Sequence, residues 1–467
     1  MDTPAARQQC LRPECAATFE IRETHAECPR CGALLDIRYD WDRLPLPKKA
    51  SDLGRVPPDA AGDPRAVSGV WRFGALLPFA PPEFRQTLGE GHTQLRAAPR
   101  VACYAGVKNL YLQYEGLNPS GSFKDNGMAG AFTHAAMTGA KVAACASTGN
   151  TSASLAAFAA AGGLMRAVIF VGDGKIAYGK LSQALDYGAL TLLVRGDFDD
   201  AMARVREVSK AEGIYLVNSV NPFRLEGQKT TMYRVLEGLG WETPDWIVCP
   251  GGNLGNSSAF AKALGELHEL GFIDKMPRLA VVNAQGAPTL ARLVNDHGVR
   301  WNGGQPPRDR IAAYYAELDR AGPKAKTLAS AIEINRPVNL EKCLRGLELT
   351  RGAATAVSDQ EILDAKAIVA REGLGCEPAS AAAVAGLGKL AAAGVIDRDA
   401  RVVCVLTGHQ LKDPHATVAY HSYDAARLAA DYGGYGIRAQ PHANHPVAVA
   451  NDASAIVDAV RAGLARG

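Results

Sequence analysis

The chain of 467 residues lacks the features that define several large protein classes. No apolar run reaches about 18 residues, so we expect no membrane-spanning helix. Residues 1–20 are charged and contain no apolar core, so we expect no secretory signal peptide. The formal net charge is only +3, which gives no electrostatic basis for binding nucleic acid or an anionic membrane. We therefore expect a cytoplasmic protein without a nucleic-acid or membrane partner.

The sequence also lacks an internal repeat. Its composition, 47% apolar and 21% charged, is that of an ordinary globular protein, and its length exceeds one typical core. Strand-like runs alternate with helix-compatible segments, which predicts parallel, doubly wound α/β domains. The strand-like runs are 109–114, 141–146, 166–171, 190–195, 214–218, 245–249, 278–283 and 401–406.

Cysteine is present in two different settings among the ten residues of this type. Several cysteines, such as Cys145, lie inside apolar runs and are expected to be buried free thiols in a reducing cytoplasm. Near the N-terminus, two close pairs can instead close a tetrahedral zinc site. The four candidate ligands are Cys10, Cys15, Cys28 and Cys31. A ribbon that has lost its metal, or four unrelated thiols, would give the same pattern.

The stretch that carries most chemistry surrounds Lys124. The β-rich run 109–114 and then a Pro/Gly turn precede it, and the helix-compatible run 128–137 follows it. A lysine at such a strand-to-helix crossing can lose solvent, lower its pKa and act as an amine nucleophile. Most lysines chosen at random are instead surface residues.

Three other stretches of small, hydrogen-bonding residues also follow apolar strand-like runs. They are 146–152, 251–256 and 407–413. The loop 251–256 suits an anion, because glycine lets backbone N–H groups approach a phosphate at a helix N-terminus. It is neither a Walker loop nor a G-x-G-x-x-G fingerprint, and a structural turn remains the alternative.

These four stretches, in this order, resemble the pyridoxal-phosphate enzymes of the tryptophan-synthase-β type, and among them the threonine synthases. The resemblance runs from about residue 28 to residue 413. It implies two α/β domains of fold type II with the cofactor between them. Lys124 would hold the cofactor and move protons, Asn150 would meet the ring hydroxyl, and Thr407 the ring nitrogen. The implied phosphate cup is Gly251, Gly252, Asn253, Leu254, Gly255 and Asn256.

The resemblance also implies a second anion site, for a substrate phosphate. Its implied residues are Ser147, Thr148, Asn218, Ser219 and Arg224. An arginine among hydroxyl and amide donors suits a phosphate dianion, although Arg224 could equally form a structural ion pair with Glu226. The implied reaction converts O-phospho-L-homoserine and water to L-threonine and phosphate. A threonine or serine dehydratase, a β-replacement enzyme acting on O-phosphoserine, and a catalytically dead zinc-ribbon binding protein are the alternatives.

The expected organisation has four parts. They are a zinc-ribbon-like module (1–42), a linker (43–66), a catalytic body (67–413) containing a smaller mobile subdomain (132–235), and a C-terminal extension (414–467). A homodimer is expected. The segment 377–380 resembles the family's segment beside the cofactor ring, or else is a capped helix start. Asn126 and Gln410 depart from the family's usual residues.

Overall fold

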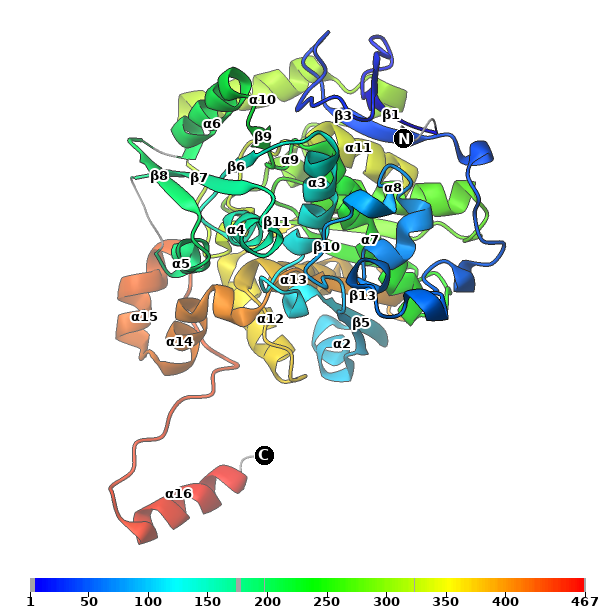
Figure 1. Cartoon of the computed structure of the whole chain (residues 1–467). Coiled ribbons are helices and arrows are strands. Elements are labelled where there is room, and N and C mark those ends of the chain that lie inside the picture. Colours follow the sequence, from blue (N-terminus) through cyan, green and yellow to red (C-terminus); the bar gives the residue numbers. More distant parts are fainter. Residues whose placement is uncertain (1–4, 174–177, 197, 323, 466–467) are drawn as a thin grey trace.

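Two sheets organise the chain in the computed structural model, which describes residues 5–173, 178–196, 198–322 and 324–465 (Figure 1). The larger sheet has the strand order β12-β11-β10-β13-β5-β4, and only the edge pair β4–β5 is antiparallel. Its strands are β4 (Gln94–Ala97), β5 (Asn109–Tyr114), β10 (Trp246–Pro250), β11 (Arg278–Ala284), β12 (Ala353–Val357) and β13 (Arg401–Leu406). The central strands are buried on both faces, as the apolar runs predict.

The smaller sheet is entirely parallel and has the order β8-β7-β6-β9. Its strands are β6 (Val142–Ala146), β7 (Arg166–Gly172), β8 (Leu190–Val194) and β9 (Tyr215–Leu216). All four lie within residues 132–235. The predicted pair of doubly wound α/β units is therefore confirmed.

Helices connect and cover the strands. They are α1 (Pro64–Val67), α2 (Pro99–Ala105), α3 (Lys124–Met137), α4 (Asn150–Gly162), α5 (Tyr178–Asp186), α6 (Phe198–Glu212), α7 (Pro222–Gly238), α8 (Gly255–Glu269), α9 (Thr289–Asn295), α10 (Arg308–Ala321), α11 (Leu340–Leu349), α12 (Asp359–Ala370), α13 (Pro378–Ala392), α14 (Pro414–Ser422), α15 (Ala425–Tyr432) and α16 (Ala453–Leu464). Helices α3 and α7 pack closely because a Cβ on Gly227 would lie 1.9 Å from the backbone oxygen of Asn126. Only glycine permits that approach.

The N-terminal residues form a three-stranded antiparallel sheet of order β2-β1-β3. Its strands are β1 (Ala6–Cys10), β2 (Thr18–Glu20) and β3 (Leu35–Tyr39). The Tyr39 hydroxyl donates to Glu226 on α7 at 2.6 Å, and the Lys342 ammonium on α11 donates to the Leu35 carbonyl at 2.6 Å. Polar contacts thus hold this small sheet against helices α7 and α11.

The C-terminal segment divides into a packed part and a projecting part. Leu428 of α15 and Tyr420 of α14 share an apolar cluster with Leu363 of α12. The segment after Ile437 still contacts the body, as far as the Asn444 N–H that donates to His421 Nδ1 at 2.9 Å. Helix α16 stands away from the body with no buried residue (Figure 1). None of the helices in the described parts of the chain is both long and apolar enough to span a membrane.

All eight strand-like runs contain strands, although β9 covers only Tyr215–Leu216 of the run 214–218. Outside the N-terminal sheet, the strands that the sequence did not predict are β4 and β12. The β12 residues, Ala353–Val357, are mostly alanine, which has low strand propensity, so pairing with β11 decides their conformation. The edge strand β4 is largely exposed and shows no buried-strand pattern.

Candidate active site

A hollow lies where three neighbouring strands of the larger sheet end. Strand β5 leads towards Lys124, β10 runs into the glycine loop, and β13 ends just before Thr407. These strands are adjacent in the order β10-β13-β5 and parallel, so their carboxyl ends meet at one edge. Nine predicted site residues line the hollow: Lys124, Ser219, Arg224, Gly252, Asn253, Leu254, Gly255, Asn256 and Thr407.

Lys124 is the first residue of α3, and its ammonium nitrogen lies 3.8 Å from the centre of the Phe123 ring. The pKa of the amine is lowered to about 7, chiefly by burial and also by the positive charge of Arg224, while the carboxylate of Glu377 partly opposes both. A lysine with such a pKa has a substantial neutral fraction at neutral pH, and the neutral amine is the nucleophile. The surface-lysine alternative is wrong.

The glycine loop between β10 and α8 is built for close approach of a ligand. A Cβ on Gly251 would lie 2.7 Å from the Val281 side chain, and one on Gly252 would lie 2.9 Å from the Ala331 carbonyl. Leu254 adopts a left-handed conformation (φ 62°), and α8 begins at Gly255. Gly255 and Asn256 line the hollow, so the N–H groups of the first turn of α8 are available to an anion there. This loop fits the phosphate of pyridoxal phosphate.

Three polar side chains from separate elements meet at another wall of the hollow. The Asn150 amide, at the start of α4, donates to both carboxylate oxygens of Glu377, at 3.0 and 3.1 Å. The Thr407 hydroxyl is 2.9 Å from that of Ser380 and 3.5 Å from Glu377 Oε1. Glu377 also immediately precedes Pro378, the first residue of α13, so this segment is a helix start, and its place beside the cofactor ring stays a prediction.

Arg224 is almost completely buried, with an exposed fraction of 1%, yet it has no carboxylate partner among the described residues. One guanidinium nitrogen, Nη1, donates to the Val217 carbonyl at 2.6 Å, and Nε has no partner. Burial lowers the pKa of Arg224 to about 10, although Cys145 slightly opposes the shift. A buried arginine with a free donor at the wall of a hollow is well suited to an anionic ligand.

The alternative partner of Arg224, Glu226, is engaged elsewhere. Its carboxylate forms ion pairs with Lys229, at 2.7 Å, and with Lys262, and it accepts the hydrogen bond from Tyr39. The alternative interpretation, a structural ion pair between Arg224 and Glu226, is therefore wrong. Residues two apart on a helix project in different directions, which explains why neighbours in sequence serve different sites.

Five predicted residues lie outside the lining: Ser147, Thr148, Asn150, Gly251 and Asn218. Asn150 and Gly251 directly adjoin lining residues. The amide of Asn218 is used by the backbone, since it accepts from the Ala146 N–H and donates to the Ala146 carbonyl, both at 3.0 Å. The Ser147 hydroxyl accepts from the Gly149 N–H at 3.1 Å. The roles given to these residues stay predictions.

Seven residues line the hollow that were not predicted as site residues: Phe123, Gln228, Pro250, Ala331, Ile332, Glu377 and Ala379. Gln228 follows Arg224 by four positions on α7, so the two side chains share a face of that helix. This four-residue spacing from Arg224 is the sequence signal that could have identified Gln228 as a lining residue. Glu377 belongs to the segment 377–380, which resembles the family's segment beside the cofactor ring, but this resemblance indicates no role for the carboxylate.

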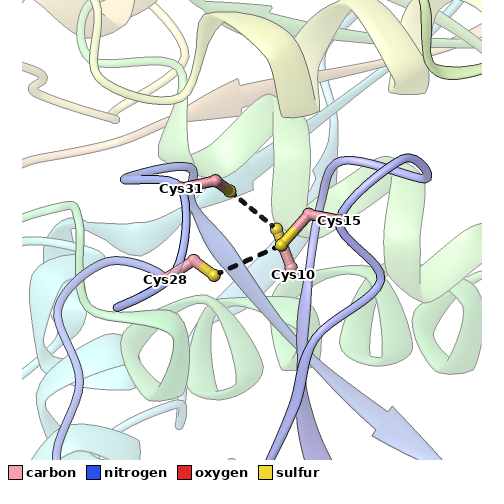
Figure 2. Close-up of side chains that lie close together, drawn as sticks. All are labelled: Cys10, Cys15, Cys28 and Cys31. Atoms are coloured by element: carbon pink, nitrogen blue, oxygen red, sulfur yellow. Dashed lines mark hydrogen bonds between the residues drawn. The ribbon is translucent and has the colours of Figure 1, made fainter.

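The four N-terminal cysteines converge on one point (Figure 2). All four sulfur atoms lie within 4.8 Å of one another, with Cys10 and Cys31 3.5 Å apart and Cys15 and Cys28 3.8 Å apart. Tetrahedral coordination with zinc–sulfur bonds of about 2.3 Å requires sulfur atoms about 3.8 Å apart. The cluster therefore fits a four-thiolate zinc site.

Comparison with known proteins agrees with this geometry. The family model described as "Pyridoxal-phosphate dependent enzyme" matches residues 86–408. The threonine synthase of Methanocaldococcus jannaschii is 40% identical over 412 residues, which are 88% of this chain and 94% of that protein. The threonine synthase of Methanosarcina acetivorans is 41% identical over 406 residues, covering 87% and 92%.

The chain belongs to the threonine synthase family of pyridoxal-phosphate-dependent enzymes. Its cofactor is pyridoxal phosphate. Among solved structures, the processed form of threonine deaminase isoform 2 from Solanum lycopersicum matches with a TM-score of 0.55. It is 17% identical and covers 72% of this chain and 82% of its own, so this likeness concerns the fold alone. The predicted fold type II is thereby confirmed.

Proposed function

We propose that this enzyme is a threonine synthase that converts O-phospho-L-homoserine and water into L-threonine and phosphate. The buried Arg224, without a carboxylate partner, carries the proposal. The glycine loop already suits the cofactor's phosphate, so an additional buried cation at the same hollow calls for a second anion. A substrate that bears its own phosphate supplies that anion, and an unphosphorylated amino acid does not.

The proposed roles of the residues follow from their positions. Pyridoxal phosphate supplies the electron sink that makes the substrate's carbon-bound protons removable. Lys124 holds the cofactor and, once released by the substrate amine, takes and returns protons at the substrate carbons. Asn150, held by Glu377, would meet the ring hydroxyl, and Thr407 would meet the ring nitrogen. A hydroxyl need not protonate that nitrogen, so the electron sink is weaker than one paired with an aspartate.

The overall reaction balances without a further reactant. The bond between Cγ and the phosphate oxygen breaks, and phosphate leaves with the bonding electrons. One proton leaves Cβ and one reaches Cγ, while water gives its hydroxyl to Cβ and its remaining proton to the departing phosphate. Ser219 and Arg224 line the same hollow as Lys124, so they can retain the phosphate end while the amine acts on the carbon chain. The other residues proposed for that phosphate are Ser147, Thr148 and Asn218.

The deciding assay supplies O-phospho-L-homoserine to the purified holoenzyme and measures threonine and phosphate. We expect the two products in equal amounts. Release of ammonia from threonine or serine, with no turnover of phosphohomoserine, would indicate a dehydratase instead. Turnover of O-phosphoserine alone would indicate a β-replacement enzyme. A protein that binds no pyridoxal phosphate would indicate a catalytically inactive binding protein.

We further propose that the cysteine cluster holds one zinc ion and belongs to a module of residues 1–42. The proposed division continues with a linker (43–66), a catalytic body (67–413) with a mobile subdomain (132–235), and an extension (414–467). A homodimer in the cytoplasm is proposed from the family resemblance. Helix α16 exposes Ile456, Val457, Val460 and Leu464, which leaves its apolar side chains available to a partner subunit. Sedimentation of the purified protein tests the dimer.

A further inference from the structure

Helix α7 presents a second unpartnered polar side chain to the hollow, one turn beyond Arg224. Gln228 is buried, with an exposed fraction of 3%, and lines the hollow. Its amide oxygen has no hydrogen-bond partner within the described part of the chain. A buried carboxamide is normally paired, and each exception needs an explanation. A ligand at the hollow would supply the missing partner.

The neighbours of Gln228 show at which end of the hollow its amide lies. A Cβ on Gly127 of α3 would lie 2.8 Å from Gln228 Nε2, and a Cβ on Gly255 would lie 3.3 Å from Gln228 Oε1. The amide is therefore held between the helix that begins at Lys124 and the first residue of α8. It lies beside the glycine loop that suits a phosphate.

A neighbouring residue repeats the same feature. Asn256, the second residue of α8, also lines the hollow, and its buried side-chain oxygen has no partner. With Nε of Arg224, three polar side chains at one hollow thus hold an unpaired polar atom. The oxygen and nitrogen of a carboxamide can exchange places by a half-turn of the side chain, so Gln228 and Asn256 can both present N–H donors. Such a set of donors fits a ligand rich in acceptor oxygens.

We propose that Gln228 is a phosphate-binding residue, whose amide N–H donates to a phosphate oxygen at the end of the hollow between α7 and α8. Two phosphates can reach this position, that of the cofactor and that of the substrate. For the substrate, the inference rests on the function proposed above. For the cofactor, it rests only on family membership and the contacts of Gln228.

The test uses two substitutions and one matched control. Gln228→Glu keeps the shape but places a negative charge against the phosphate, and Gln228→Met keeps the length but removes both donors. The control, Thr231→Val, lies on the same helix and removes a buried hydroxyl that has no partner and does not line the hollow. For each variant we measure the apoenzyme's affinity for pyridoxal phosphate and for pyridoxal, the kcat and KM for phosphohomoserine, and inhibition by inorganic phosphate.

If Gln228 binds the cofactor's phosphate, both variants lose about 10- to 150-fold in affinity for pyridoxal phosphate and keep their affinity for pyridoxal. If it binds the substrate's phosphate, the KM for phosphohomoserine rises by a similar factor. Inhibition by inorganic phosphate then weakens in parallel, while kcat and cofactor affinity stay near those of the control. Either result supports the proposal.

The proposal is overturned if the phosphate-dependent quantities of both variants match those of Thr231→Val. It is also overturned if pyridoxal phosphate and pyridoxal lose affinity equally together with a lowered Tm, because Gln228 would then be structural. If Gln228→Glu does not fold, Gln228→Met decides. A wild-type enzyme that releases no phosphate from phosphohomoserine refutes the proposed function instead. The comparison of pyridoxal phosphate with pyridoxal, and inhibition by inorganic phosphate, then still decide the role of Gln228.

Discussion

Replacing Arg224 with alanine tests the assignment of the substrate most directly. The guanidinium has one donor, Nε, that no described residue uses, and the side chain lines the hollow. Loss of one hydrogen bond from a charged group to the substrate phosphate costs about 1.5–3 kcal/mol. At 1.36 kcal/mol for each factor of ten, kcat/KM should fall about 10- to 150-fold. Pyridoxal phosphate should still bind, because the glycine loop is untouched.

The stability of this variant should change little, because two effects oppose each other. Alanine loses the 2.6 Å hydrogen bond to the Val217 carbonyl, but it also removes a buried charge that has no carboxylate partner. Arg224→Lys should restore activity only in part, since an ammonium does not reproduce the planar, forked guanidinium. Phosphate release from phosphohomoserine is the assay, and the yellow colour of bound cofactor is the control.

The substitution also makes a prediction about Lys124. The charge of Arg224 contributes to lowering the pKa of the Lys124 amine to about 7, so Arg224→Ala should raise that pKa. Recombination of the apoenzyme with pyridoxal phosphate needs the neutral amine, and the pH midpoint of its rate should therefore move upward. Loss of cofactor or of fold in Arg224→Ala, or unchanged turnover of phosphohomoserine, would refute the reasoning.

Three further predictions test other parts of the site. Reduction of the holoenzyme with borohydride and peptide mapping should place the cofactor on Lys124, and a label on another lysine would contradict the assignment. Glu377→Gln should move the recombination midpoint below pH about 7, opposite to Arg224→Ala, because the Glu377 carboxylate raises the pKa of Lys124. X-ray absorption should detect zinc–sulfur bonds of about 2.3 Å. Serine at Cys28 and Cys31 should abolish that signal and lower the Tm, whereas serine at the exposed Cys103 should do neither.

The position of the site could be predicted because it depends on strand order and direction alone. Parallel strands bring their carboxyl ends to one edge, so residues that follow them gather there, however distant in sequence. Lys124, the glycine loop and Thr407 each follow a strand that an apolar run reveals. The four-cysteine cluster was predictable for a similar reason, since the spacing of each pair allows its two thiols to converge.

The contacts of individual side chains could not be predicted in the same way. The amide of Asn218 is engaged by the backbone of Ala146 in the neighbouring strand β6, a contact that its place in the sequence does not reveal. Gln228 was passed over because the face of α7 that meets the hollow depends on how that helix packs against α3. Glu377 was overlooked because its position at the start of a helix was sufficient to explain it. Each of these outcomes depends on tertiary packing that no local pattern encodes.

The close packing of α3 against α7 explains why the two cationic side chains of the site, Lys124 and Arg224, lie near each other. The missing Cβ of Gly227 allows the helices to approach, and this brings Arg224 near the amine of Lys124. The repulsion between the two charges favours a neutral, nucleophilic lysine before an anion is present. A phosphate bound beside Arg224 would compensate its charge and favour protonation of Lys124 once the lysine is free. Substrate binding would thereby prepare the lysine to return a proton, and an unphosphorylated amino acid could not cause this change.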